Sequence, residues 1–341
     1  MPAATYYQRL GSSNLRVSRL CLGTMMFGGA TDKTESSNII ASARDHGLNF
    51  IDTADVYNNG SSEEIVGELL QGQRDNWVLA TKIGNATRKD GKTLPNESHY
   101  SRQWLIRGVE NSLKRLGTDY IDILYLHRDF EQENLEEAAL ALGDLIRAGK
   151  IRSFGLSNFR GWRIAEMIHL CRQLHIPQPV VLQPYYNMLN RGPEVEILPA
   201  CSHYGLGVVP YSPIARGVLT GKYQPGATPD PDSRMGRGDS RIRETEFREE
   251  SLKIAQTIVE HAKQRGVSPG QFAAAWVLAN PIITSVIAGP RTLAQMEDYY
   301  GALDISISAE EESMINALVT PGHPSTPGYN DPNYPFYGRP V

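Results

Sequence analysis

Strand-like and helix-like patterns alternate along most of this chain, and eight such repeats can be followed. Short apolar stretches at 48–51, 77–81 and 121–126 are each followed by a longer segment with helical periodicity. Such alternation is typical of a parallel sheet whose strands are joined by crossover helices. A length of 341 residues suits one closed barrel of this kind. We therefore predict an α/β fold, a (β/α)8 TIM barrel in a single domain over residues 1–341, with an N-terminal hairpin around residues 11–14.

Two segments break this rhythm. Residues 212–244, after the seventh strand, are irregular and rich in Gly, Pro and Arg, with six basic residues against four acidic ones. This excess fits a flap over a phosphorylated cofactor, although an ordinary solvated loop is the alternative. Residues 320–341 lack periodicity and form either a flexible segment or a C-terminal wrapping tail. Wrapping is favoured because the segment contains four aromatic residues, Tyr329, Tyr334, Phe336 and Tyr337.

Charge and composition argue against several classes of partner. The chain has 34 basic and 38 acidic residues, a formal net charge of −4, so neither nucleic acid nor an anionic membrane is an expected partner. A small-molecule substrate is expected instead. Residues 1–10 do not resemble a secretory signal, and no run approaches the ~18 apolar residues of a membrane helix, which predicts a cytoplasmic protein. Neither a metal site nor a disulfide framework is expected, because HxH, HExxH and CxxC spacings are missing around the histidines and around Cys21, Cys171 and Cys201.

Four polar residues, Asp52, Tyr57, Lys82 and His127, each follow closely on a strand-like stretch. In a closed parallel barrel the carboxyl ends of the strands lie on one face, so these side chains are expected to meet there. They supply the parts needed to reduce a carbonyl group. A phenol with an ordinary pKa near 10 is a weak acid, but the Lys82 ammonium would lower the pKa of Tyr57. Asp52 would hold Lys82, and His127 would donate a hydrogen bond to the carbonyl oxygen.

Each of the four also has an ordinary structural explanation. Asp52 could cap the segment that follows it, Tyr57 could lie on a surface loop, and Lys82 and His127 could be solvated strand ends. Coincidence becomes less convincing because the four placements fall on consecutive strands. The reverse reaction, oxidation of an alcohol, would use the same residues with Tyr57 as the base.

Several segments resemble the signatures of the aldo-keto reductase family. The strongest are 50–57, 79–82, 120–127 and 155–159. The resemblance extends in the same order over most of the chain, from Gly23 to about Asp298, through segments 183–187, 211–213, 217–223 and 287–289. The element at 220–223 and the overall length are similar to the bacterial branch that includes the potassium-channel β subunits.

The resemblance implies an eight-stranded barrel that binds a nicotinamide cofactor, usually NADPH/NADP, without a Rossmann domain. The chain agrees in one respect, because no GxGxxG opens a strand–helix unit. Catalytic residues carried over from the family are Asp52, Tyr57, Lys82 and His127. In the family the histidine is the ordinary choice at position 127, which disfavours reduction of carbon–carbon double bonds.

Cofactor-binding residues are also implied by position. Ser157, Asn158 and Gln183 would hold the nicotinamide carboxamide, and Tyr211 would stack on its ring. Asp52 and residues of three loops would line the ring and the pyrophosphate: Gly23, Thr24, Met25, Ser212, Pro213, Ile214, Gly217, Leu219, Lys222 and Arg234. The adenosine would be surrounded by Gly289, Arg291, Gln295 and Asp298. A helix N-terminus and a guanidinium there would suit a 2′-phosphate.

Segment 289–292 lacks the Lys-Ser pairing of many NADPH-preferring relatives, so the preference for NADPH rests on Arg291, and NAD stays an alternative. We predict an NADPH-dependent oxidoreductase that reduces an aldehyde or ketone to an alcohol, with Tyr57 as the general acid or base. One alternative is a sugar or polyol dehydrogenase that works in the oxidative direction. Another is a cofactor-binding regulatory subunit that resembles the channel β subunits. The sequence leaves open the physiological substrate and whether the protein forms a homo-oligomer.

Overall fold

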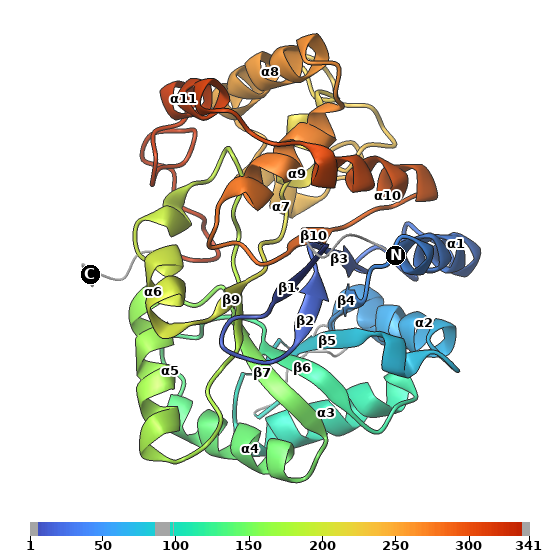
Figure 1. The fold of residues 1–341 in the computed structure, drawn as a ribbon, viewed down its shortest axis with the longest axis vertical. Coiled ribbons are helices and arrows are strands. Elements are labelled where there is room, and N and C mark those ends of the chain that lie inside the picture. The colour runs from blue at the N-terminus through green and yellow to red at the C-terminus, as the bar shows by residue number, and fades with distance from the viewer. Residues whose placement is uncertain (1–5, 86–95, 98, 336–341) are drawn as a thin grey trace. The chain divides into compact units, whose positions relative to one another are not determined.

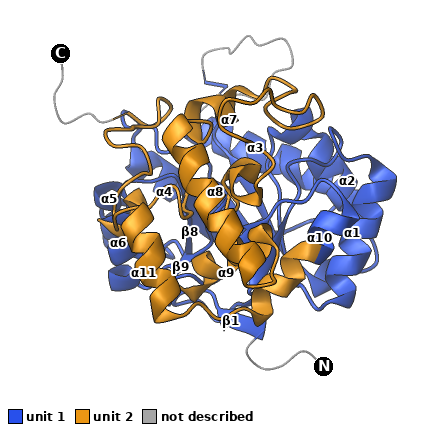
Figure 2. Cartoon of the chain, turned by 90° about the horizontal axis from the view of Figure 1, so that it is seen from above, with its two compact units in different colours: residues 1–184, 196–211, 281–297 blue, residues 185–195, 212–280, 298–341 orange. Residues whose placement is uncertain are grey.

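The computed structural model describes residues 6–85, 96–97 and 99–335. By its internal contacts the chain divides into two compact units, which Figure 2 shows in blue and orange. Unit 1 consists of Met1–Pro184, Glu196–Tyr211 and Pro281–Glu297, and unit 2 consists of Tyr185–Val195, Ser212–Asn280 and Asp298–Val341. The prediction that residues 1–341 form a single domain stays a prediction.

A sheet of parallel strands forms the centre of unit 1 (Figure 1). Its order, among the described residues, is β10-β3-β4-β5-β6-β7-β8-β9. The two outer strands also meet, because Thr284 N donates to Val208 O at 2.9 Å and Ile287 N donates to Pro210 O at 3.0 Å. The predicted (β/α)8 barrel is confirmed, with strands β3 (Leu20–Gly23), β4 (Phe50–Asp52), β5 (Val78–Ile83), β6 (Ile121–Leu126), β7 (Ile151–Ser157), β8 (Val181–Gln183), β9 (Gly207–Val208) and β10 (Val286–Ala288).

The predicted N-terminal hairpin is also present, as strands β1 (Tyr7–Arg9) and β2 (Arg16–Ser18) in antiparallel pairing. Its turn lies at the amino-terminal ends of β8 and β9. Gly11 has φ +55, and a Cβ there would lie 2.3 Å from Gly207 N and 2.7 Å from Val180 O. Leu10 and Val17 therefore reach the buried core, where they pack with residues that point inward from the strands: Cys21, Phe50, Ala80, Ile123, Tyr125, Val181, Val209 and Ile287.

Helices follow the strands of unit 1 and lie outside the sheet (Figure 1). Their ends match local sequence signals. The Asp32 side chain accepts a hydrogen bond from Glu35 N at the start of the first helix, and Gly117 ends the third in a left-handed conformation. These helices are α1 (Lys33–Asp45), α2 (Ser61–Leu69), α3 (Arg102–Leu116), α4 (Leu135–Arg147), α5 (Gly161–Gln173) and α6 (Ile197–Tyr204). A further helix, α10 (Leu293–Tyr300), follows β10, and its last three residues belong to unit 2.

Unit 2 contains the long loop expected to be irregular and the C-terminal segment. The loop includes a 3-10 helix, η5 (Ala215–Thr220), and ends in the short helix α7 (Ser240–Thr245). The other helices that lie in this unit are α8 (Glu249–Gln264), α9 (Pro269–Ala279) and α11 (Ala309–Leu318). Across the described ranges of both units, no helix combines the length and apolar character that a membrane span requires.

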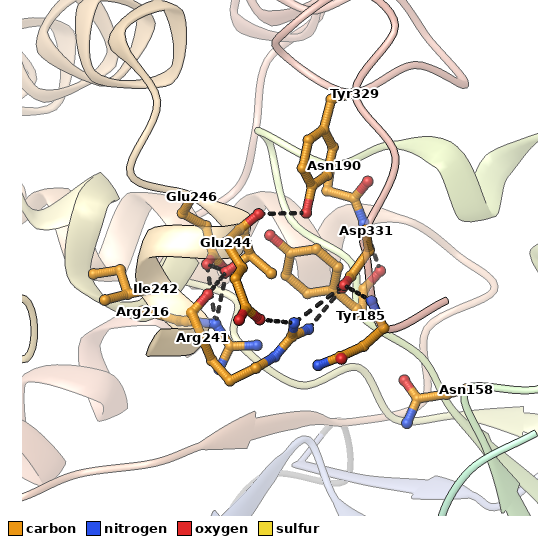
Figure 3. A network of polar contacts seen from close by, with 12 residues as sticks. Asn158, Tyr185, Asn190, Arg216, Arg241, Ile242, Glu244, Glu246, Tyr329 and Asp331 are labelled. Atoms are coloured by element: carbon orange, nitrogen blue, oxygen red, sulfur yellow. Dashed lines mark hydrogen bonds and ion pairs between the residues drawn. The ribbon is translucent and has the colours of Figure 1, made fainter. Parts of the chain in front are cut away.

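The C-terminal segment contacts α7 (Figure 3) and the residue that precedes α8 through charged and aromatic side chains. Arg241 donates to both carboxylate oxygens of Asp331, at 3.1 and 2.7 Å. Tyr329 donates to Glu244 O at 3.1 Å, and the Arg248 guanidinium lies 3.7 Å from the centre of the Tyr329 ring. That residues 320–341 as a whole wrap the protein stays a prediction, and Phe336 and Tyr337 lie outside the described residues.

Candidate active site

The ammonium group of Lys82 joins three of the four predicted catalytic residues. Lys82 lies on β5 and is 1% exposed. Its Nζ donates to the Asp52 carboxylate in a short contact, to Thr53 O at 2.8 Å and to the Tyr57 hydroxyl at 3.1 Å. Asp52 is the last residue of β4. The neighbouring strands β4 and β5 therefore place the Asp52 carboxylate and the Lys82 ammonium beside each other at their carboxyl ends.

A tight turn after β4 sets the position of Tyr57. The turn is the 3-10 helix η2 (Tyr57–Gly60), in which Asn58 and Asn59 have φ 48 and 57. Asparagine tolerates this left-handed conformation better than most residues do. The Asn58 amide also donates to Met25 O at 2.9 Å and Phe27 O at 2.7 Å. The loop after β3 thus anchors the turn that carries the phenol.

The electrostatics of the buried pair favour a charged lysine. Burial alone would lower the pKa of Lys82, but the charges and hydrogen bonds of Asp52 and Tyr57 outweigh it and leave the pKa above its ordinary value. Burial raises the pKa of Asp52, and the contacts with Lys82 and Gln183 oppose that rise. An ammonium held in this way stabilises negative charge on a neighbouring oxygen, here the oxygen of Tyr57.

His127, the fourth predicted residue, lies beside the phenol. The two ring centres are 6.0 Å apart in an edge-on arrangement, and His127 N donates to Ile83 O at 2.9 Å. Burial and the Lys82 charge lower the pKa of His127 to about 3. Its Nδ1 is buried without a hydrogen-bond partner among the described residues. A neutral imidazole can donate a hydrogen bond to a substrate oxygen without carrying a charge.

A second polar group lies at the carboxyl ends of β7 and β8. Asn158 has φ 61, and its amide donates to Ser157 Oγ at 3.0 Å and to His127 O at 3.1 Å. The Tyr211 hydroxyl donates to Asn158 Oδ1 at 2.7 Å, and Gln183 Nε2 donates to Asp52 Oδ2 at 2.9 Å. These neutral hydroxyl and amide groups fit a neutral carboxamide, and the Tyr211 ring adds a flat apolar surface. The donor set therefore fits a nicotinamide.

Comparisons with known proteins agree with this site. Residues 19–320 match the aldo/keto reductase family. The chain belongs to this family. It is 36% identical to a protein described as a probable voltage-gated potassium channel subunit beta from Arabidopsis thaliana, over 88% of this chain and 91% of the relative.

Two bacterial relatives carry enzyme names. The chain is 36% identical to the uncharacterized oxidoreductase YrpG of Bacillus subtilis, over 92% of this chain and 95% of the relative. It is 34% identical to the L-glyceraldehyde 3-phosphate reductase of Escherichia coli, over 93% of each chain. The protein is thus an oxidoreductase, an aldo-keto reductase that depends on a nicotinamide cofactor, in a family that acts on small carbonyl compounds.

The end of β3 and the loop after it hold three predicted cofactor residues of this aldo-keto reductase. Thr24 Oγ1 lies 3.0 Å from Asp52 O and 2.9 Å from Ser62 Oγ, so its hydroxyl is used within the protein. A Cβ at Gly23 would lie 2.6 Å from a methyl group of Ile287, which explains the glycine by packing. Met25 contributes its carbonyl oxygen to Asn58. Contacts of these residues with a cofactor stay predictions.

Three of the residues predicted to surround the adenosine lie together in unit 1. Arg291 N donates to Gln295 Oε1 at 2.8 Å, and Thr31 Oγ1 donates to Arg291 O at 2.8 Å. A Cβ at Gly289 would meet no atom within 4 Å, so the space beside this glycine is open. The amino-terminal end of α10 follows directly, which is compatible with an anionic group.

The remaining predicted cofactor residues lie in unit 2. Lys222 folds back over Gly217, where a Cβ would lie 2.5 Å from the Lys222 Nζ. Arg234 is paired with Asp239 at 2.6 Å, and Asp298 accepts a hydrogen bond at 2.9 Å from Ser268, the N-cap of α9. These two side chains have structural partners that the sequence did not reveal. The other residues of this set form the start of the loop and η5: Ser212, Pro213, Ile214 and Leu219.

The sequence did not predict the buried polar residues of α2 that bond to the neighbours of the site residues. Ser62, in the first turn of α2, lies 2.9 Å from the hydroxyl of Thr53 as well as from that of Thr24. Glu63 is completely buried and accepts hydrogen bonds at 2.6 Å from Thr81 and from Arg115. The one local signal was a pair of polar residues at a helix start, which ordinarily indicates exposure rather than burial.

Proposed function

We propose that this protein reduces an aldehyde or ketone with NADPH, and that Tyr57 gives its proton to the carbonyl oxygen. The observation that carries the proposal is the 3.1 Å contact between Lys82 Nζ and the Tyr57 hydroxyl, with Asp52 on the same ammonium. A phenol needs such assistance, because its ordinary pKa near 10 makes it a weak acid at neutral pH.

The residues divide the work as follows. Lys82, oriented by Asp52, stabilises the negative charge that develops on the phenol oxygen as its proton leaves. His127 is neutral and donates a hydrogen bond to the carbonyl oxygen, which polarises the bond. When bound, a reduced nicotinamide supplies the hydride. The opposite direction would use the same groups, with Tyr57 as the base.

Cofactor recognition is proposed to combine the neutral cluster with a cationic end. Ser157, Asn158 and Gln183 would hold the carboxamide, and Tyr211 would pack on the ring, which is supported by the hydrogen bonds among them. Selection of NADPH over NAD would rest on Arg291 beside the start of α10, because a guanidinium pairs well with a phosphate.

The test removes the hydroxyl group of Tyr57 and keeps its aromatic ring. Tyr57→Phe should lower turnover by about 10²-fold or more, as expected for removal of a general acid, while NADPH affinity stays nearly unchanged. Tyr120→Phe is the matched control, because Tyr120 precedes β6 and bonds to Asp75, away from Lys82. Retention of most of the activity in Tyr57→Phe would overturn the assignment.

The substrate can be sought with a nicotinamide-absorbance screen run in both directions and with both cofactors. Aldehydes, ketones, sugars and pyridoxal belong in the panel, and so does a phosphorylated aldehyde, because one relative is named as an L-glyceraldehyde 3-phosphate reductase. A rise in absorbance with NADP and a polyol, without reduction of any carbonyl compound, would favour the oxidative alternative.

A second candidate function is a cofactor-binding regulatory subunit. It is supported by 36% identity to the Arabidopsis protein named as a probable channel subunit. The two proposals differ in turnover. A purified protein that binds NADPH but consumes none across the whole panel would favour the regulatory role, whereas steady consumption with any carbonyl compound would favour the reductase.

A further inference from the structure

Two further buried carboxyl groups, those of Asp55 and Glu63, lie close to Lys82. Asp55 is 3% exposed and Glu63 is fully buried. The Asp55 backbone N donates to Lys82 O at 3.2 Å, and Thr81, the neighbour of Lys82 on β5, donates to Glu63. Asp55 is therefore joined to the strand of the catalytic ammonium by its backbone and Glu63 by its carboxylate, yet neither residue has a role in the chemistry described above.

The two carboxyl groups have very different surroundings. Both oxygens of Glu63 have a donor at 2.6 Å, Thr81 Oγ1 on Oε1 and Arg115 Nε on Oε2. Asp55 accepts a hydrogen bond from the Val56 backbone, but its Oδ1 is buried without a partner among the described residues. Glu63 is thus built to carry a charge. A charged Asp55 would be poorly solvated, which is costly for a buried group.

The balance of charges around Lys82 leads to the same result. Asp52 balances Lys82, and Glu63 balances Arg115, so each cation already has one carboxylate. Asp55 is the fifth group and has no cation of its own. Burial and the charge of Glu63 raise the pKa of Asp55 well above its ordinary value, although Arg115, the Val56 N–H and Lys82 oppose that rise.

We propose that Asp55 and Glu63 form a positioning pair close to Lys82, in which Glu63 is the carboxylate and Asp55 is a neutral carboxylic acid. This inference rests on the proposed function of Tyr57. The pair leaves Lys82 with Asp52 as its single counter-ion. Ionisation of Asp55, two positions before Tyr57, would favour the protonated phenol and shift the pH at which it loses its proton.

The charged or titratable groups around the pair come from each neighbouring element. Glu63 belongs to α2, Arg115 to α3 and Lys82 to β5. Four further titratable groups interact with Lys82 or with Asp52: Cys21 of β3, Tyr57 of η2, Tyr125 of β6 and His127. A shift produced by the pair must therefore act through Lys82 or directly on Tyr57.

The test measures kcat/KM for carbonyl reduction against pH. Reduction needs the protonated phenol, so the rate falls on the alkaline side. In Glu63→Gln the amide keeps hydrogen-bonding groups but removes the charge that keeps Asp55 neutral, so Asp55 should ionise beside Arg115. The alkaline limb should then move up by roughly 0.5–1 pH unit. Glu64→Gln is the matched control, an exposed glutamate one position away, and should leave the limb in place.

Two further variants separate charge from structure. Asp55→Asn copies the neutral acid and should keep the alkaline limb of the pH profile at its wild-type position. The double variant Asp55→Asn/Glu63→Gln has no carboxyl group of the pair left to ionise, so it should lack the upward shift of Glu63→Gln. The proposal is overturned if Asp55→Asn alone moves the alkaline limb of the kcat/KM profile to lower pH. It is also overturned if Glu63→Gln folds and leaves that limb at its wild-type pH.

Infrared spectroscopy tests the protonation of Asp55 without a measurement of enzyme activity. At neutral pH the cofactor-free protein should show an infrared band of a protonated carboxyl group that disappears in Asp55→Asn and persists in Glu64→Gln. A spectrum unchanged by Asp55→Asn would overturn the pair. This result is independent of Tyr57→Phe, so failure of the proposed function and failure of the pair can be distinguished.

Discussion

Gln183 Nε2 donates a hydrogen bond to Asp52 Oδ2 at 2.9 Å, although the two residues are 131 positions apart in the chain. Lys82 occupies the other oxygen of the same carboxylate. Gln183 is also expected, by resemblance, to hold the nicotinamide carboxamide. One side chain therefore links the proposed cofactor site to the proposed acid–base site. A substitution that disturbs either site should also change the other.

Replacing Gln183 with methionine tests this link. Methionine has a similar volume but no donor, so a buried carboxylate oxygen would lose its hydrogen bond. We expect the free energy of unfolding to fall by about 1.5–3 kcal/mol, the usual range for a hydrogen bond to a charged group. Denaturant unfolding measures this loss. Gln173→Met, at the exposed end of α5, is the control, and an equal effect in both variants would contradict the link.

Replacing Lys82 with methionine should damage the fold as well as the activity. Lys82 and Asp52 are 1% and 3% exposed, so the variant leaves an uncompensated carboxylate in the core. A loss of about 3–5 kcal/mol in the free energy of unfolding is expected when one partner of a buried pair is removed. The double variant Asp52→Asn/Lys82→Met should regain much of that stability but no turnover. If the single variant unfolds at the wild-type denaturant concentration, the pair does not stabilise the fold.

His127 should make the protein less stable in acid. Its pKa is about 3 in the folded protein, below the ~6.5 of an unperturbed histidine. Between these values the unfolded chain binds a proton that the folded chain does not, so stability is lost as the pH falls through that window. His127 is partly exposed, and after discounting for solvent we expect about 1 kcal/mol of this loss between pH 7 and pH 5.

The measurement compares denaturant unfolding at the two pH values. His127→Gln removes the titrating group, so its unfolding free energy should depend less steeply on pH than that of the wild type. His203→Gln, which changes an exposed histidine, should keep the wild-type dependence. Equal slopes in the wild type and in His127→Gln would show that this imidazole is not held neutral.

The sequence was sufficient for the fold and for the centre of the site because both depend on local patterns. Apolar stretches such as Ile121–Leu126 are buried strands, and a polar residue that follows one must lie at the carboxyl end of the barrel. Asp52 and Lys82 were predictable for that reason, and Tyr57 joined them because its turn is short. The strand order then required their proximity.

What lies behind the site could not be predicted, since it depends on contacts between helices. Glu63 lies in the first turn of α2 and Arg115 in the last turn of α3, and the sequence does not show that these two turns meet. The family resemblance also did not predict an ion pair between residues close together in the chain. Arg234 was expected to contact the cofactor, yet Asp239, five positions later, forms an ion pair with it.

The ion pair between Arg216 and Glu246 should contribute strongly to the stability of unit 2. The two side chains are 9% and 0% exposed, and Arg216 Nε lies 2.9 Å from Glu246 Oε2 (Figure 3). Arg216→Met would leave the glutamate charged and buried, so we expect a loss of about 3–5 kcal/mol in the free energy of unfolding. Hydrogen exchange in α7 and α8 would show whether the loss is confined to this unit.

The control for Arg216→Met is an ion pair of the same unit that lies in solvent. Lys253 and Glu249 are 64% and 70% exposed, and water screens such a pair, so Lys253→Met should leave the unfolding transition almost unchanged. In the double variant Arg216→Met/Glu246→Gln no charge stays unpaired, and most of the lost stability should return. If Arg216→Met behaves like Lys253→Met, then Glu246 takes up a proton or reaches water, and the buried pair does not hold unit 2 together.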